Sequence, residues 1–110
     1  MTAPRFDDLI HPSTRLSIVA LLAAADWADF GYVRDQLDLS DSALSKQLST
    51  LEQAGYVTVD RTLRRRVRAR LTSDGRTAFL GHVAALQAIV ATANASSASS
   101  PGSPGDRPRS

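Results

Sequence analysis

The stretch LSDSALSKQLSTLEQAGYVTVDR, residues 39–61, contains the start of a helix, its apolar stripe, its end and the beginning of a strand. Ser40 suits the N-cap, because its hydroxyl can accept a hydrogen bond from a free backbone N–H of the first turn. Gly55 suits the left-handed position that commonly ends a helix. The segment therefore predicts a helix over residues 41–54 that follows a tight turn. Three leucines at helical spacing form its buried stripe: Leu44, Leu48 and Leu51.

Six arginines follow within ten residues, in RTLRRRVRAR at positions 61–70, whereas the rest of the chain holds only seven Lys and Arg. From Arg66 to Leu71 arginine alternates with apolar residues, which is the period of a half-buried strand. YVTVD, residues 56–60, alternates in the same way. The two segments predict a β-hairpin whose tip is RTLRR.

The positive charge of the chain is local. Residues 1–60 carry four basic and nine acidic side chains, net −5, and residues 61–110 carry nine basic and two acidic ones, net +7. Such an asymmetry predicts a patch that attracts a polyanion. Arginine suits DNA, because its planar fork binds phosphate, reads guanine and stays charged. The tip arginines expected to contact DNA are Arg61, Arg64, Arg65 and Arg66.

Two arginines lie further down the strand, Arg68 and Arg70, and they leave two alternatives open. They could extend the DNA contact, and Arg68 is included in the expected DNA surface. They could instead pair with Asp60 or cover the sheet with their stems.

The face of helix 41–54 opposite its leucines is small and polar. It could be a merely solvated surface, but between a tight turn and a basic hairpin we interpret it as facing a DNA groove. Serine hydroxyls bond to either base type and to phosphate, so they position the protein more than they specify a sequence. The DNA contacts predicted from this helix and its cap are Ser40, Ser42, Ser45, Lys46 and Ser49.

Two further helices are predicted before the turn. Pro12 suits a first helical turn, and TRLSIVALLAAA, residues 14–25, has its apolar residues at helical spacing. A second, short helix is predicted to begin near Phe30, with Asp29 as its N-cap, and to end at about Asp38.

Thr72 is the expected cap of a last helix from about Ser73 to Ala93. No charged residue occurs between Arg76 and Asp106. Because a solvent-facing helix normally carries charge on its outer side, we expect this helix to be covered by its own domain and by a partner. A membrane span is not expected, since the uncharged run is short and contains polar residues. The predicted dimer contacts are Phe79, His82, Val83, Leu86, Ile89 and Val90; His82 is expected at the interface or the surface.

The remaining features of the sequence indicate how the chain is divided into domains and which classes of protein are not expected. NASSASSPGSPGDRPRS has nothing to bury, which predicts a disordered tail, 94–110, after one domain, 1–93. With no cysteine and two histidines we expect no metal and no cofactor. No catalytic constellation is present, so no enzyme is expected. MTAPRFDDLI lacks the apolar region of a secretory signal or anchor, which favours the cytoplasm.

Helix, helix, tight turn, helix and a hairpin with a basic tip is the order of a winged helix-turn-helix domain, a mainly α fold with a small β-hairpin. Three segments carry a closer resemblance: IHPSTRLSIVALL, LSDSALSKQLSTLEQAGYVTVDR and LTSDGRTAFLGHVAAL. On these segments the chain resembles the small bacterial winged-helix transcriptional regulators related to the MarR and ArsR families.

The resemblance implies a dimeric regulator of double-stranded DNA. Helix 41–54 then lies in the major groove, the 61–66 wing touches the backbone or minor groove, and the terminal helices form a homodimer. A second hypothesis is a winged-helix module for protein–protein interaction, in which the uncharged last helix binds another protein. The sequence leaves open the operator, any small-molecule effector, the direction of regulation and the face of the last helix that dimerises.

Overall fold

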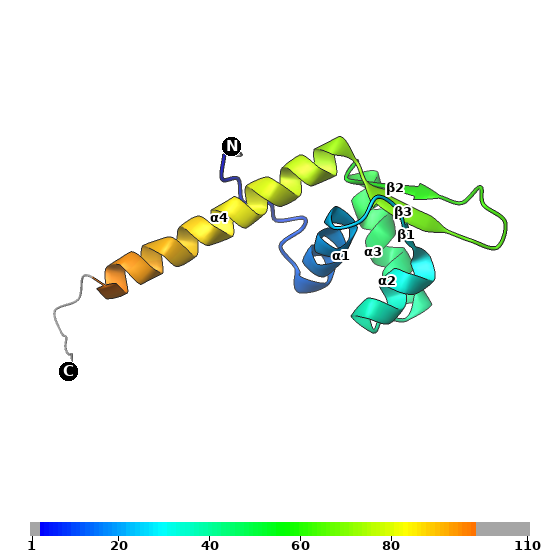
Figure 1. Cartoon of the computed structure of the whole chain (residues 1–110), viewed down its shortest axis with the longest axis horizontal. Helices are drawn as coiled ribbons and strands as arrows, with labels where there is room; N and C mark the ends of the chain where they lie inside the picture. Colours follow the sequence, from blue (N-terminus) through cyan, green and yellow to red (C-terminus); the bar gives the residue numbers. More distant parts are fainter. Residues whose placement is uncertain (1–2, 99–110) are drawn as a thin grey trace.

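The part of the chain that the structure describes forms four helices and a three-stranded sheet, and the last of these helices projects from the rest (Figure 1). The computed structural model describes residues 3–98. The elements are α1 (Ser13–Ala23), β1 (Ala28–Asp29), α2 (Phe30–Leu37), α3 (Asp41–Gln53), β2 (Val57–Asp60), β3 (Arg68–Leu71) and α4 (Ser73–Ala98). The predicted fold class, mainly α with a small β-hairpin, is confirmed.

The sheet is antiparallel, with the strand order β1-β3-β2. β2 and β3 form the predicted hairpin, in which Asp60 lies opposite Arg68. The sequence predicted two strands and missed β1, whose Ala28 pairs with Ala69. A strand of two residues is too short to show alternation, so only its partner strand reveals it.

The core lies between the helices and one face of the sheet. Along β3 the burial alternates, with Ala69 and Leu71 buried and the arginines on the other face. The predicted leucine stripe of α3 is buried as well. The buried apolar side chains are Ile10, Ile18, Val19, Leu22, Ala28, Val33, Leu44, Leu48, Leu51, Val57, Ala69 and Leu71.

Local capping fixes where α3 begins and ends. Asp38 adopts a left-handed φ of 53° after α2, a conformation that aspartate tolerates better than most residues. The Ser40 hydroxyl accepts a hydrogen bond from the Ala43 N–H at 3.1 Å, so the predicted N-cap is confirmed. Gly55 follows α3 with a φ of 81°, which is the conformation expected of it.

α4 has 26 residues and is about 39 Å long at 1.5 Å per residue. The Thr72 hydroxyl accepts a hydrogen bond from the Gly75 N–H at 3.0 Å, as expected of its cap. The helix continues to Ala98, beyond the predicted end at Ala93, because no glycine or proline interrupts it there. The rest of the predicted tail lies outside the described residues.

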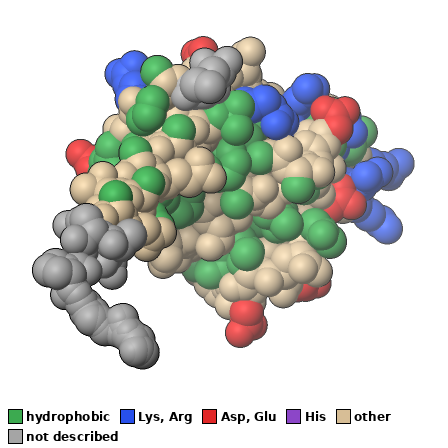
Figure 2. All heavy atoms as spheres, turned by 60° about the vertical axis from the view of Figure 1, so that its left-hand side comes forward, with side chains coloured by type: hydrophobic (Ala, Val, Ile, Leu, Met, Phe, Trp, Pro, Cys, Tyr) green, Lys and Arg blue, Asp and Glu red, His purple; other side chains and the backbone are tan. Residues whose placement is uncertain are grey.

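By length and composition alone, α4 could cross a membrane: Ser73–Ala95 has a hydropathy of 1.4, and 11% of the 18-residue window so scored is buried in the protein. Its first half, however, packs on α1 and β3. It also carries Asp74, Arg76 and the buried His82, which a bilayer interior disfavours. Figure 2 shows apolar side chains across one face of the molecule, with most charged ones at its margins.

Candidate nucleic-acid interface

α3 presents a polar surface on the side away from its leucines. Ser42, Ser45, Lys46 and Ser49 are all exposed. Ser40 is exposed too, but its hydroxyl is used for the cap and lies 3.4 Å from that of Ser42. The structure therefore brings the predicted helix residues together on one face, with Ser40 at its edge.

The loop between β2 and β3, residues 61–67, is ordered by its own side chains. The Asp60 carboxylate accepts hydrogen bonds from the Thr62 N–H at 2.9 Å and hydroxyl at 2.6 Å. These bonds, with a further contribution from Arg68, lower the pKa of Asp60. At the tip, Arg65 has a left-handed φ of 60°, and the Arg66 N–H donates to the Leu63 carbonyl at 3.3 Å.

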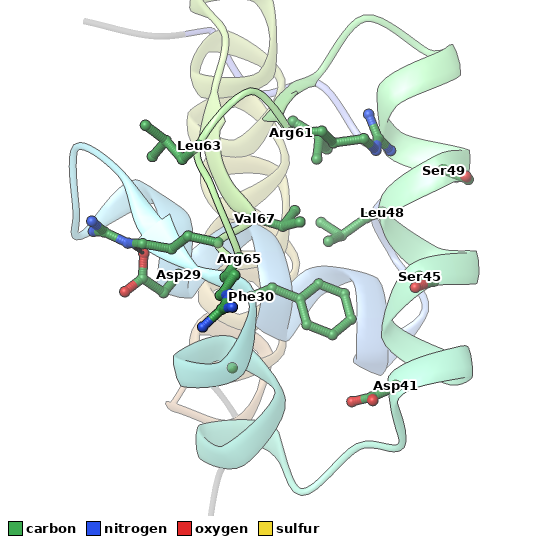
Figure 3. Close-up of a pocket in the computed structure, with 13 residues that line it drawn as sticks. Asp29, Phe30, Asp41, Ser45, Leu48, Ser49, Arg61, Leu63, Arg65 and Val67 are labelled. Atoms are coloured by element: carbon green, nitrogen blue, oxygen red, sulfur yellow. Dashed lines mark hydrogen bonds and ion pairs between the residues drawn. The ribbon is translucent and has the colours of Figure 1, made fainter.

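A groove of about 690 Å³ separates this loop from α3 (Figure 3). Ser45 and Ser49 line it from α3, and Arg61 and Arg65 line it from the loop. Phe30 also lines it and, like Leu48, points into the space between the two walls in Figure 3. The polar helix face and the basic loop thus border one surface, as the sequence predicted.

A helix with a polar face beside a basic hairpin is the arrangement of a known class of DNA-binding protein. The family model described as a winged helix DNA-binding domain matches residues 14–90. The chain belongs to this family. An uncharacterized protein of Methanocaldococcus jannaschii is 32% identical over 78 residues, which cover 68% of this chain and 85% of the relative.

Solved structures share the winged-helix fold. The transcriptional regulator homologue protein from Pyrococcus horikoshii OT3 has a TM-score of 0.75 and 22% identity, over 78% of this chain and 88% of that chain. YusO from Bacillus subtilis has a TM-score of 0.69 and 21% identity, and the match covers 74% of this chain and 60% of YusO. The predicted resemblance to winged-helix DNA-binding proteins is confirmed. Because the family consists of DNA-binding domains, the prediction that the chain is not an enzyme also holds.

The four arginines of the wing, the loop 61–67, differ in their partners. Both Nη atoms of Arg61 lie 3.3 Å from an oxygen of Glu52, and these bonds raise the pKa of Arg61. Arg66 Nε lies 3.0 Å from an oxygen of Asp29. Among the described residues, Arg64 and Arg65 pair with no carboxylate. The sequence missed these acidic partners, because each comes from a separate element.

Arg68 and Arg70 lie on the outer face of the sheet and not in the groove. Arg68 Nε is 3.1 Å from Asp60, and its guanidinium lies 4.2 Å from the centre of the Trp27 ring. Arg70 is 5.1 Å from the same ring and pairs with Asp26 at 3.2 Å. Of the two alternatives, pairing with Asp60 is what the structure shows for Arg68. Its charge is thus paired and stacked in the structure, and its contact with DNA stays a prediction.

Asp41 begins α3, where its carboxylate interacts favourably with the positive end of the helix dipole. It also accepts a hydrogen bond from Arg34 of α2 at 2.9 Å. Arg34 bonds to Asp35 as well, and the two carboxylates, Asp35 first, raise its pKa. The ion pair between Arg34 and Asp41 joins α2 to α3 across the turn.

His82 is fully buried, so its expected place at a dimer interface or on the surface is wrong. The N-terminal segment, residues 3–12, covers it. The Asp7 N–H donates to His82 Nδ1 at 2.9 Å, and His82 Nε2 lies 3.3 Å from His11 Nδ1. Phe6 packs edge-on against the His82 ring at 4.7 Å. No periodic pattern marks this segment, so the cover over His82 could not be predicted from the sequence.

The hydrogen bonds of His82 determine which of its two ring nitrogens carries the proton. Because Nδ1 accepts from Asp7, the remaining proton of the neutral ring lies on Nε2, which donates to His11. Burial, and then the proximity of His11, lower the pKa of His82 below its ordinary value. In a protonated ring Nδ1 would also carry a hydrogen, so it could no longer accept the hydrogen bond from the Asp7 N–H.

We expect a loss of stability in mild acid from this histidine. Below the ordinary pKa of about 6.5 the unfolded chain binds a proton that the folded chain does not, so the free energy of unfolding falls as the pH drops. The urea midpoint should decrease between about pH 7.5 and pH 5.5. His82→Gln, which can still accept from Asp7, should lose most of this dependence. An unchanged dependence in that variant would assign the effect to other groups.

The other predicted dimer residues lie along α4, four of them on one stripe and Ile89 on its flank. Phe79, Val83 and Leu86 are half-buried against the chain itself. Ile89 and Val90 are 58% and 57% exposed. At about 100° per residue Val90 continues the stripe of Phe79, Val83 and Leu86 beyond the body of the domain, and Ile89 lies on its flank. The outer part of this face has no cover within the described residues.

Proposed function

We propose that the protein is a transcriptional regulator that binds specific sequences of double-stranded DNA as a homodimer in the cytoplasm. α3 lies in the major groove, and the wing contacts the backbone or the minor groove. The observation that carries this proposal is that the polar face of α3 and the basic wing border one groove (Figure 3).

The dimensions and chemistry of α3 support the major-groove assignment. An α-helix with its side chains is about 10–12 Å across and fits a major groove about 12 Å wide. Ser45, Lys46 and Ser49 are short or flexible side chains on its exposed face. They reach base edges and phosphates without obstructing the approach of the backbone.

The uncovered stripe of α4 supports the homodimer. Exposed Val90, with exposed Ile89 on its flank, extends an apolar face that the domain itself partly buries further back along the helix. A second copy can cover this face by packing the same stripe against it, as in an isologous interface. Two recognition helices then read two half-sites about one helical turn apart.

Substitution of the two wing arginines that have no acidic partner among the described residues tests whether the protein binds DNA through its wing. Changing Arg64 and Arg65 together to Ala should weaken binding to all duplexes and flatten the slope of log affinity against log salt by up to about two units per wing. Changing Ser45 and Lys46 to Ala should instead reduce the preference for the operator over unrelated DNA. The operator is first obtained by selecting bound duplexes from a random pool.

An unchanged salt slope in the Arg64 and Arg65 variant would favour the second candidate function. In that case α4 binds another protein, and its exposed apolar residues are the observation in favour. Binding of duplex DNA by the unmodified protein, measured at two salt concentrations, separates the two functions.

A further inference from the structure

Two of the four wing arginines are held by carboxylates that come from outside the wing. Arg61 faces Glu52, near the end of α3, with two N–O distances of 3.3 Å. Arg66 faces Asp29, at the end of β1, at 3.0 Å. The side chains of all four residues are between 36% and 58% exposed, so DNA phosphates can approach both pairs from solvent.

We propose that Glu52 and Asp29 act as internal counterions that hold Arg61 and Arg66 away from DNA phosphate and so limit the affinity of the wing for any duplex. The inference rests on the proposed DNA-binding function. A carboxylate and a phosphate compete for the same planar fork of an arginine. Each pair must therefore open before its arginine can offer its whole fork to a phosphate, and the carboxylate left nearby repels that phosphate.

The consequence is a division of the wing into two free and two restrained arginines. Arg64 and Arg65 are available at once, whereas Arg61 and Arg66 offer their whole fork only after they exchange partners. Exposed ion pairs contribute little to folding, so the stability of the domain does not explain these acids. Asp29 lines the groove, and Glu52 holds Arg61, which lines it, so DNA affinity is the property that these acids control.

Glu52→Gln and Asp29→Asn remove the counterions with little change in shape. Glutamine is a good helix former, and asparagine is a good N-cap at the start of α2. In a titration with a short random-sequence duplex, each variant should bind more tightly than the unmodified protein. Its slope of log affinity against log salt should steepen by about 0.9 unit for each wing that gains a phosphate contact.

Asp26→Asn is the matched control, because it makes the same change of charge and also releases an arginine, Arg70. That arginine lies on the opposite face of the sheet from the groove. A gain in the control equal to that of the two test variants would mean that net charge alone is responsible, which overturns the proposal.

A second variant separates the counterion effect from a direct contact of Glu52 with DNA. In an Arg61→Ala background, Glu52→Gln should no longer steepen the slope, because the arginine that it releases is absent. If the slope still steepens there, Glu52 does not act through Arg61 and the proposal fails. If the unmodified protein shows no salt-dependent duplex binding, the proposed function fails as well, and the two failures are distinguishable.

Discussion

Gly75→Ala should unfold a large fraction of the protein at moderate temperature. An added Cβ at this position would lie 2.1 Å from the Tyr56 carbonyl oxygen and 2.9 Å from its carbon. This carbonyl cannot retreat freely, because it accepts a hydrogen bond from the Thr72 N–H at 3.0 Å. The clash therefore opens the junction between β2 and α4. We expect a loss of at least about 3 kcal/mol, which lowers the melting temperature by about 12 °C or more.

Gly31→Ala is the control for this experiment. Gly31 lies in the first turn of α2, and its added Cβ would meet only the end of the Arg34 side chain, at 3.5 Å. Alanine favours a helix over glycine by up to about 1 kcal/mol, so this variant should melt at the same temperature or higher. Equal melting temperatures for the two variants would show that the junction at Tyr56 is more adaptable than the structure indicates.

The parts of the fold that the sequence predicted are those determined by neighbours along the chain. The start of α3 depends on Ser40 and a backbone N–H three residues later, and its end depends on Gly55. The hairpin follows from alternation within two adjoining segments. These signals are complete within a few residues, so reading the chain locally is enough to place them.

The parts that the sequence missed depend on contacts between distant segments. Asp29 and Arg66 are 37 residues apart, and Asp7 and His82 are 75 apart. The candidate site shows the same division. The sequence predicted that α3 and the wing arginines would gather at one surface. It could not predict which arginines are paired with acids, because that depends on where β1 and the end of α3 lie in the folded chain.

Ile89→Glu should abolish the proposed homodimer and with it most of the affinity for a two-half-site operator. Ile89 is 58% exposed in the single chain, so a glutamate there meets water in the monomer and the fold is retained. In a dimer it would place an unpaired charge inside an apolar interface. Leu86 is half-buried against its own domain, so a charge at that position would mix loss of folding with loss of association.

The readouts are the mass of the particle in sedimentation and the affinity for the selected operator. Loss of the second half-site contact removes the gain from bivalent binding, so affinity should fall by about a hundredfold or more. Ala88→Glu adds the same charge to an exposed position on the side of the helix opposite the stripe, about 160° around from Val90, and it should leave the dimer intact. If the unmodified protein already sediments as a monomer at micromolar concentration, or if both variants stay dimeric, α4 does not form the interface through Ile89.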